Sequence, residues 1–203
     1  MKILAHRGTW STASEQNSLA ALNRALADGH GIETDVRDRG DELVIVHDAF
    51  AAPHCTLAEL ATILGGGPIA LNVKADGLAP RLARQLSGDF AARSFYFDMS
   101  VPDMRAYLAH GLPVFTRHSD VEPEPAYYAA ASGVWLDSLE GPFSHSINVV
   151  RSHLANGKKI AIVSEELHKR DHTEQWRALA ALKDEVNVYL CTDLVAEAAA
   201  AFG

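Results

Sequence analysis

Short runs of β-branched and aromatic residues alternate along the chain with alanine- and leucine-rich stretches of helical period. This rhythm is typical of repeated strand–helix units, and we count about eight of them. Strands are expected at Lys2–Ala5, Gly31–Val36, Ile69–Val73, Ser94–Phe97, Pro113–Phe115, Val134–Leu136, Lys159–Val163 and Val186–Leu190. Helices are expected to begin near Ser18, Leu57, Leu78, Pro102, Pro123, Ser146, Thr173 and Leu194. An extra strand, Leu43–Val46, should form a hairpin with the second strand.

About eight such units predict an α/β fold, a compact (β/α)8 TIM barrel with an extra hairpin strand after strand 2. At 203 residues the barrel would be nearly minimal, since ~250 are typical. An open doubly wound sheet is the alternative, disfavoured because no GxGxxG or GxxxxGK[ST] motif follows the first strand. No linker or low-complexity tract interrupts the chain, so a single domain, 1–203, is expected.

Composition narrows the partners. With 48% hydrophobic and 22% charged residues the chain is typical of a globular protein, and its net charge of −8 argues against a nucleic-acid partner. Cys55 and Cys191 have no CxxC partner and are interpreted as core residues. No run of ~20 apolar residues could span a membrane, and the first apolar run is too short for a secretory signal. A cytoplasmic protein is expected, and the sequence leaves its oligomeric state open.

Polar residues follow the predicted strands where a barrel carries its reactive groups. Glu33 and Asp35 are two positions apart and should project from the same side of one strand. Two adjacent carboxylates repel unless a cation lies between them, and oxygen ligands suit Mg²⁺ or Ca²⁺. Asn72 and Lys74 repeat this spacing and could add a neutral ligand and a fixed positive charge. Alternatively, Glu33 and Asp35 form structural ion pairs inside the barrel mouth.

Two histidines follow different strands near this site. His6 and His47 could divide the roles of general acid and general base near neutral pH. Arg7 offers a planar guanidinium that matches phosphate oxygens, and Lys74 offers a second positive charge. Two imidazoles, two cations and a metal site together indicate phosphodiester cleavage.

The motifs that carry these residues resemble those of glycerophosphodiester phosphodiesterases. They are His6-Arg7-Gly8, Gln16-Asn17-Ser18, Ile32-Glu33-Thr34-Asp35-Val36, Val44-Ile45-Val46-His47-Asp48, Leu71-Asn72-Val73-Lys74 and Cys191-Thr192-Asp193. The resemblance implies a barrel that uses Mg²⁺ or Ca²⁺ to hydrolyse a small glycerophosphodiester into glycerol phosphate and an alcohol. It also implies that His6 and His47 are catalytic, that Arg7 and Lys74 bind substrate, and that Glu33 and Asp35 bind the metal.

The sequence departs from the family pattern in three places. Asn72 stands where the family usually has Glu, Gln16 replaces the Glu of a Glu-Asn-Thr turn, and the usual insertion after His-Asp is nearly absent. Two negative charges are thereby lost, so a weakly bound ion is expected. Glu165 could replace a missing ligand, but we interpret it as a surface carboxylate.

Three alternatives stay open. One is a phospholipase D-like enzyme that cleaves sphingomyelin or lysophospholipids and has a similar order of motifs. Another is a barrel that binds a phosphorylated ligand without turning it over. The two amide residues at positions where the family has acids, Gln16 and Asn72, support this alternative. A metal-dependent amide hydrolase is disfavoured, since no His-x-His motif is present.

Overall fold

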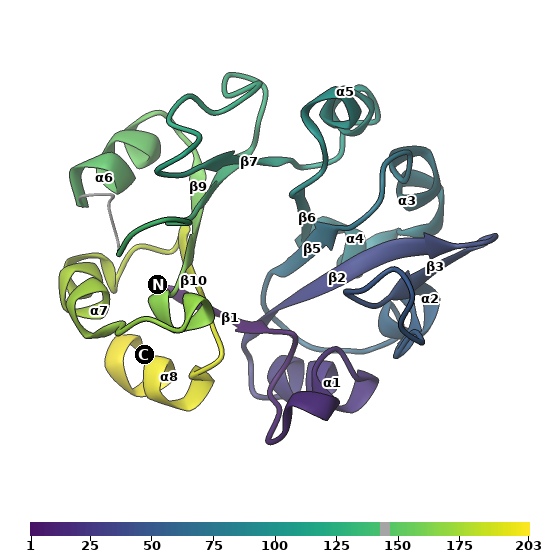
Figure 1. Cartoon of the computed structure of the whole chain (residues 1–203), viewed down its shortest axis with the longest axis horizontal. Coiled ribbons are helices and arrows are strands. Elements are labelled where there is room, and N and C mark those ends of the chain that lie inside the picture. The colour runs from purple at the N-terminus through teal and green to yellow at the C-terminus, as the bar shows by residue number, and fades with distance from the viewer. Residues whose placement is uncertain (143–146) are drawn as a thin grey trace. The chain divides into compact units, whose positions relative to one another are not determined.

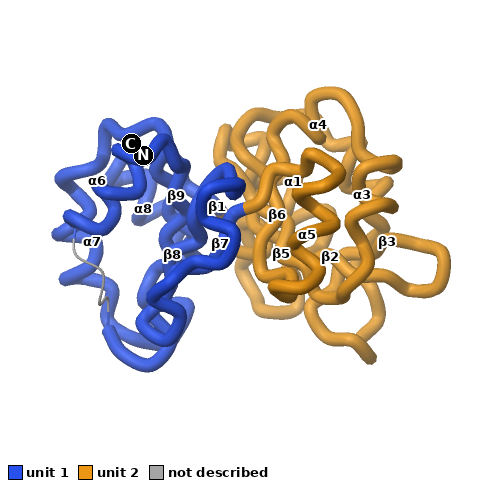
Figure 2. The backbone as a smooth tube through the Cα atoms, turned by 90° about the horizontal axis from the view of Figure 1, so that it is seen from above, with its two compact units in different colours: residues 1–4, 115–203 blue, residues 5–114 orange. Residues whose placement is uncertain are grey.

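The computed structural model describes residues 1–142 and 147–203. The chain divides into two compact units, one of residues 5–114 and one of residues 1–4 with 115–203 (Figure 2). Each of them contains both strands and helices (Figure 1). The first strand, β1 (Lys2–His6), contributes its first three residues to one unit and its last two to the other.

The unit of residues 5–114 holds every residue that the sequence predicts to be functional. Its sheet has the order β4-β3-β2-β5-β6, in which β2 pairs parallel with β5 and β5 with β6, whereas β3 runs antiparallel to both β2 and β4. Its elements are η1 (Ala13–Glu15), α1 (Leu19–Ala27), β2 (Gly31–Arg39), β3 (Glu42–Ile45), β4 (Cys55–Thr56), α2 (Leu57–Leu60), β5 (Ile69–Val73), α3 (Ala79–Gln85), α4 (Gly88–Arg93), β6 (Ser94–Phe97) and α5 (Val101–Ala109).

The unit of residues 1–4 and 115–203 has an entirely parallel strand order, β7-β8-β9-β10. Its elements are β7 (Phe115–His118), β8 (Gly133–Leu136), α6 (Ile147–Ala155), β9 (Lys159–Val163), η2 (Glu165–His168), α7 (Thr173–Leu179), η3 (Ala180–Leu182), β10 (Val188–Thr192) and α8 (Val195–Phe202). The predicted α/β class, with mostly parallel pairing, is therefore confirmed.

Local signals explain where several helices begin. The Ser18 hydroxyl accepts a hydrogen bond from the Ala21 N–H at the start of α1. Thr56 and Glu59 form a reciprocal capping box at α2. The turn before α1 needs glycine at position 8, because φ is +87° and a Cβ there would lie 2.6 Å from the Ala21 backbone. This close approach packs the turn that carries Arg7 against α1.

Some predicted boundaries are wrong. β7 and β10 each begin two residues later than expected, and α4 was not expected. The helix predicted near Pro123 does not form, since Pro125 lacks an N–H and biases Glu124 away from helical backbone angles. The start predicted near Ser146 lies outside the described residues, and α6 begins at Ile147. No helix in the described ranges is both long and apolar enough to cross a bilayer.

Candidate active site

Strand β2 places two carboxylates in the interior of its unit. Glu33 is 2% exposed and Asp35 is fully buried, and their neighbours along the strand are buried as well. Strand β5 pairs with β2 in a register that sets Asn72 opposite Asp35. The three residues predicted to bind a metal therefore come from adjacent positions on two parallel strands.

Two cations neutralise Asp35. The Nε of Arg7 lies 3.1 Å from Oδ2 of Asp35, and the Nζ of Lys74 lies 3.3 Å from Oδ1. Each of the two basic side chains is about one-fifth exposed, so their charged ends lie between the buried carboxylate and solvent. The structure thus brings together the two residues predicted to bind phosphate, and it pairs both of them with a predicted metal ligand.

Glu33 has a different environment. Its Oε2 lies 3.9 Å from the Nε2 of His6. Burial, and secondarily the charge of Asp35, raise the pKa of Glu33 to about 7, against the opposing effects of His6, Arg7 and Lys74. Near neutral pH this carboxyl group therefore holds a proton in a large fraction of the molecules.

His47 lies after β3 and is nearly half exposed. Its Nδ1 and the Oδ1 of Asp48 are 2.7 Å apart, and this bond lowers the pKa of Asp48. The contact fixes the orientation of the ring and occupies Nδ1, which leaves Nε2 as the nitrogen available to a substrate. The sequence motif contained Asp48, but sequence reasoning gave it no role.

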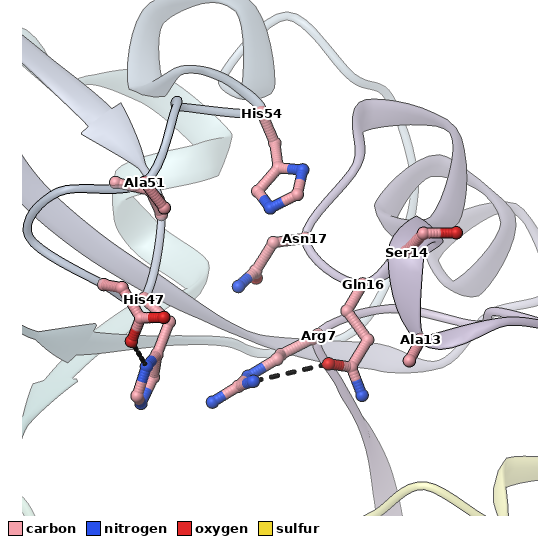
Figure 3. Close-up of a pocket in the computed structure, with 10 residues that line it drawn as sticks. Arg7, Ala13, Ser14, Gln16, Asn17, His47, Ala51 and His54 are labelled. Atoms are coloured by element: carbon pink, nitrogen blue, oxygen red, sulfur yellow. Dashed lines mark hydrogen bonds and ion pairs between the residues drawn. The ribbon is translucent and has the colours of Figure 1, made fainter.

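A pocket of about 170 Å³ lies between His47 and Arg7 (Figure 3). Turn residues 13–17 form one wall, and the segment after His47 forms another. Figure 3 shows the Arg7 guanidinium beside the Gln16 amide, whose oxygen accepts a hydrogen bond from Arg7 at 3.3 Å. Arg7 is therefore shared by the pocket and the carboxylate cluster.

Asn17 is a residue whose role sequence reasoning missed. Its Nδ2 donates to Oδ2 of Asp35 at 2.8 Å, and its Oδ1 accepts from the Thr34 hydroxyl at 2.7 Å. Its backbone N–H donates to the Arg7 carbonyl, and its φ of +60° is a conformation in which Asn is enriched. The only signal in the sequence was the quoted Gln-Asn-Ser turn, which does not show which side chain the amide reaches.

Two buried oxygens in this cluster, Oε2 of Glu33 and Oδ1 of Asn72, accept no hydrogen bond from any described residue. Oδ1 of Asp35 forms no well-aligned hydrogen bond either, but the Lys74 ammonium lies 3.3 Å from it. Within the described ranges, no group of three or more His, Cys, Asp or Glu side chains could hold a metal ion. A donor set of two carboxylates and one amide is all oxygen, and its unused acceptors fit a hard divalent cation that takes its remaining ligands from water or substrate.

The interpretation of Glu165 as a surface carboxylate is wrong. Glu165 is 2% exposed and pairs with Arg170, which also donates to the Ser138 carbonyl. The following residue, Glu166, accepts hydrogen bonds from the Ser164 and Thr192 hydroxyls. Both carboxylates thus have partners within the unit of residues 1–4 and 115–203.

The fold defined by these elements is that of glycerophosphodiester phosphodiesterases, as the resemblance of the motifs predicted. The chain is similar to the structure of a putative enzyme of this name from Galdieria sulphuraria, with a TM-score of 0.70 and 16% identity over 98% of this chain and 96% of that one. The enzyme from Agrobacterium tumefaciens gives 0.67 and 18%, covering 99% and 98%. One from Parabacteroides distasonis gives 0.65 and 18%, covering 98% and 95%. No family model and no curated protein sequence matches the chain.

Replacing Glu33 with Gln should stabilise the metal-free protein at alkaline pH. The pKa of Glu33 is raised from 4.5 to about 7, so the folded state binds this proton more tightly than the unfolded state. The stability that this provides is complete below pH 4.5 and is lost as the pH rises through 7. At pH 8, in chelator, E33Q should be more stable by on the order of 2 kcal/mol.

Calorimetric melting at pH 4.5 and pH 8 measures the difference, with the exposed Glu42→Gln as control. E33Q should approach the wild type in stability at the lower pH. A variant that is less stable than the wild type at pH 8 would show that the Glu33 charge is compensated in the folded protein.

Proposed function

We propose that the protein is a metal-dependent hydrolase of small-molecule glycerophosphodiesters that releases glycerol 3-phosphate and an alcohol. The observation that carries the proposal is the cluster on β2 and β5. Buried oxygens of Glu33 and Asn72 that accept no hydrogen bond from the described residues lie there beside the Asp35 carboxylate, which Arg7 and Lys74 neutralise, with the His6 imidazole near Glu33. The structural neighbours are described as glycerophosphodiester phosphodiesterases, which adds support, as does the likeness of fold. We also propose that the two units together form the compact (β/α)8 barrel predicted from the sequence.

Glu33, Asp35 and Asn72 would hold the cation, Mg²⁺ or Ca²⁺. When bound, the ion would neutralise charge on the phosphate oxygens. With only two acids among the ligands, we expect weak binding. A cation beside Glu33 would also favour the ionised carboxylate and displace the proton that burial retains there.

Arg7 and Lys74 orient the diester. Both side chains combine a contact to Asp35 with partial exposure, so their remaining N–H groups can donate to phosphate oxygens. Asp35 and Asn17 position the Arg7 and Lys74 side chains before the substrate binds. The Asn17 amide donates a hydrogen bond to the Asp35 carboxylate, and that carboxylate pairs with both basic groups. This preorganisation lowers the entropy lost when substrate binds.

His6 and His47 move the protons. One imidazole accepts the proton of the attacking glycerol hydroxyl group, and the other gives a proton to the leaving alcohol. Water then opens the resulting cyclic phosphate to glycerol phosphate, with the two imidazoles in reversed roles. His6 lies beside Glu33, and His47 is oriented by its contact with Asp48.

A cytoplasmic location and a role in lipid metabolism remain part of the proposal. Neither Cys55 nor Cys191 forms a disulfide, which fits a reducing compartment.

Removing either histidine should abolish turnover of alkyl diesters. We expect His6→Ala and His47→Ala each to lower kcat at least about 100-fold on glycerophosphodiesters assayed with Mg²⁺, Ca²⁺ or Mn²⁺, and chelator to stop the wild type. With a p-nitrophenyl leaving group, which needs no acid, one of the two variants should recover most of its activity.

The same assay separates the alternatives. Retention of most activity by either variant would remove that histidine from the mechanism. Binding of glycerol 3-phosphate without turnover of any diester by the wild type would favour the non-catalytic barrel.

Asn72→Glu should tighten metal binding, since it converts a neutral oxygen ligand into a carboxylate. We expect the Kd for Mg²⁺ or Ca²⁺, measured by titration calorimetry, to fall by about tenfold, and Asn72→Ala to weaken binding. The exposed Asn156→Glu is the control for added charge. An unchanged Kd in N72E would show that this position does not contact the ion.

A second candidate, hydrolysis of lipid phosphodiesters, is favoured by one observation. The segment Ala49–Pro53 has only apolar side chains, and Phe50 within it is fully exposed close to the pocket. An aromatic ring in that position could insert into a lipid aggregate.

Phe50→Ser would test this candidate. It should lower hydrolysis of lysophosphatidylcholine micelles by about tenfold, because a buried Phe side chain contributes roughly 1.5–3 kcal/mol, and should change hydrolysis of glycerophosphocholine less than about twofold. Leu64→Ser, also highly exposed, is the matched control. Equal effects on both substrates would argue against a lipid contact.

A further inference from the structure

The pocket between His47 and Arg7 has an unusual lining for a lipid or choline site. Its apolar contributions are the small side chains of Ala13, Val46 and Ala51, and none of the described residues that line it is Phe, Tyr or Trp. Polar side chains supply the rest of the wall. A trimethylammonium group binds best against aromatic rings, and an acyl chain binds against large apolar side chains, so this lining favours neither of them.

Most polar groups of the wall already have partners. Both ends of the Asn17 amide are used, by Asp35 and Thr34. Gln16 uses its oxygen on Arg7, and the Ser14 hydroxyl is bonded to Thr12. These contacts stabilise the wall but leave few of its groups for a ligand.

His54 differs from them. Figure 3 shows its ring pointing into the pocket, toward Asn17. No residue in the described part of the chain forms a hydrogen bond with the ring. A neutral imidazole has one donor and one acceptor, so His54 can either donate a hydrogen bond to a hydroxyl group or amine of a ligand or accept one from it.

The position of His54 is fixed by its backbone. Its N–H donates to the Ile45 carbonyl at 3.0 Å, at the end of β3. Arg39 donates to the Ala51 carbonyl, and the Ala51 N–H donates to Asp48 at 3.2 Å. The backbone of the segment that carries the ring is therefore held by hydrogen bonds, while the His54 residue itself is exposed.

The geometry points to this pocket as the subsite for the leaving alcohol, with His54 selecting a small alcohol that carries a hydroxyl or primary amine. The inference rests on the proposed function, since it assumes that a diester is cleaved beside His47. His47 and Arg7 both line the pocket. A phosphate held by Arg7 would therefore place one of its ester groups between them. His6, next to Glu33, is not part of this lining.

The experiment compares three diesters that share the glycerol phosphate half: glycerophosphoglycerol, glycerophosphoethanolamine and glycerophosphocholine. The wild type should prefer the first two by about tenfold in kcat/KM. His54→Ala should lower kcat/KM for these two by about fivefold, mainly through KM, because one hydrogen bond to a non-reacting group is lost. Glycerophosphocholine should change less than about twofold.

Two further variants serve as controls. His54→Gln, which keeps a donor and an acceptor, should restore much of the preference. His110→Ala, an exposed histidine of the same unit outside the pocket, should have no effect. A merely structural role of His54 would affect all three substrates in proportion.

Several results would overturn the inference. They are a wild-type preference for the choline diester, an equal loss on all three diesters in H54A, and no loss on any of them. If the wild type cleaves none of the diesters, the proposed function fails, and calorimetric binding of the intact diesters then tests the subsite. The subsite would be supported if the wild type bound glycerophosphoglycerol more tightly than glycerophosphocholine and H54A abolished this difference. Equal affinities of the wild type for the two diesters would reject it.

Discussion

The burial of two carboxylates side by side on β2 is the constraint on which the candidate site depends. An isolated ionised carboxylate in a protein interior is strongly destabilising unless it is paired or protonated. Asp35 and Glu33 meet this requirement differently. Asp35 is neutralised by Arg7 and Lys74 and receives a hydrogen bond from Asn17, whereas Glu33 lies 3.9 Å from His6 and retains its proton up to about pH 7.

These compensating groups come from turns rather than from the strand itself. Arg7 and Asn17 both have positive φ, and they are linked by a backbone hydrogen bond between the Asn17 N–H and the Arg7 carbonyl. Positive φ costs a non-glycine residue of order 1 kcal/mol or more, so two such residues in contact indicate a turn held in place by its surroundings. Here the surroundings include the buried Asp35 and the close packing of Gly8 on α1. Charge neutralisation and turn geometry therefore depend on each other.

The sequence predicted the elements of this site better than its contacts. Period-two alternation placed Glu33 and Asp35 on one side of a strand, and the strand order along the chain predicted that Asn72 would be near, because both depend only on backbone geometry. The pairing of Arg7 and Lys74 with Asp35, and the amide of Asn17, depend on side-chain reach across a turn, which no periodicity records. The burial of Glu165 was missed for the same reason, since its partner Arg170 reaches back to it from the turn that follows the 3₁₀ helix η2. Pro123 led to the prediction of a helix that does not form, because Pro125, two residues later, disfavours helical backbone angles at the residue before it.

The replacement of an acid by Asn72 changes the charge balance of the site as well as its ligand set. Glu33 and Asp35 carry two negative charges when both are ionised, and Arg7 and Lys74, which both pair with Asp35, carry two positive charges, so the four groups sum to zero. In the proposed loaded state a divalent cation would bring the sum to +2, and a third carboxylate would reduce it to +1. Asn72 in place of an acid therefore weakens the binding of the cation but strengthens the attraction of the loaded site for the phosphodiester anion. In a chain with a net charge of −8, which repels anions at long range, a strongly positive local site offsets that repulsion where the substrate binds.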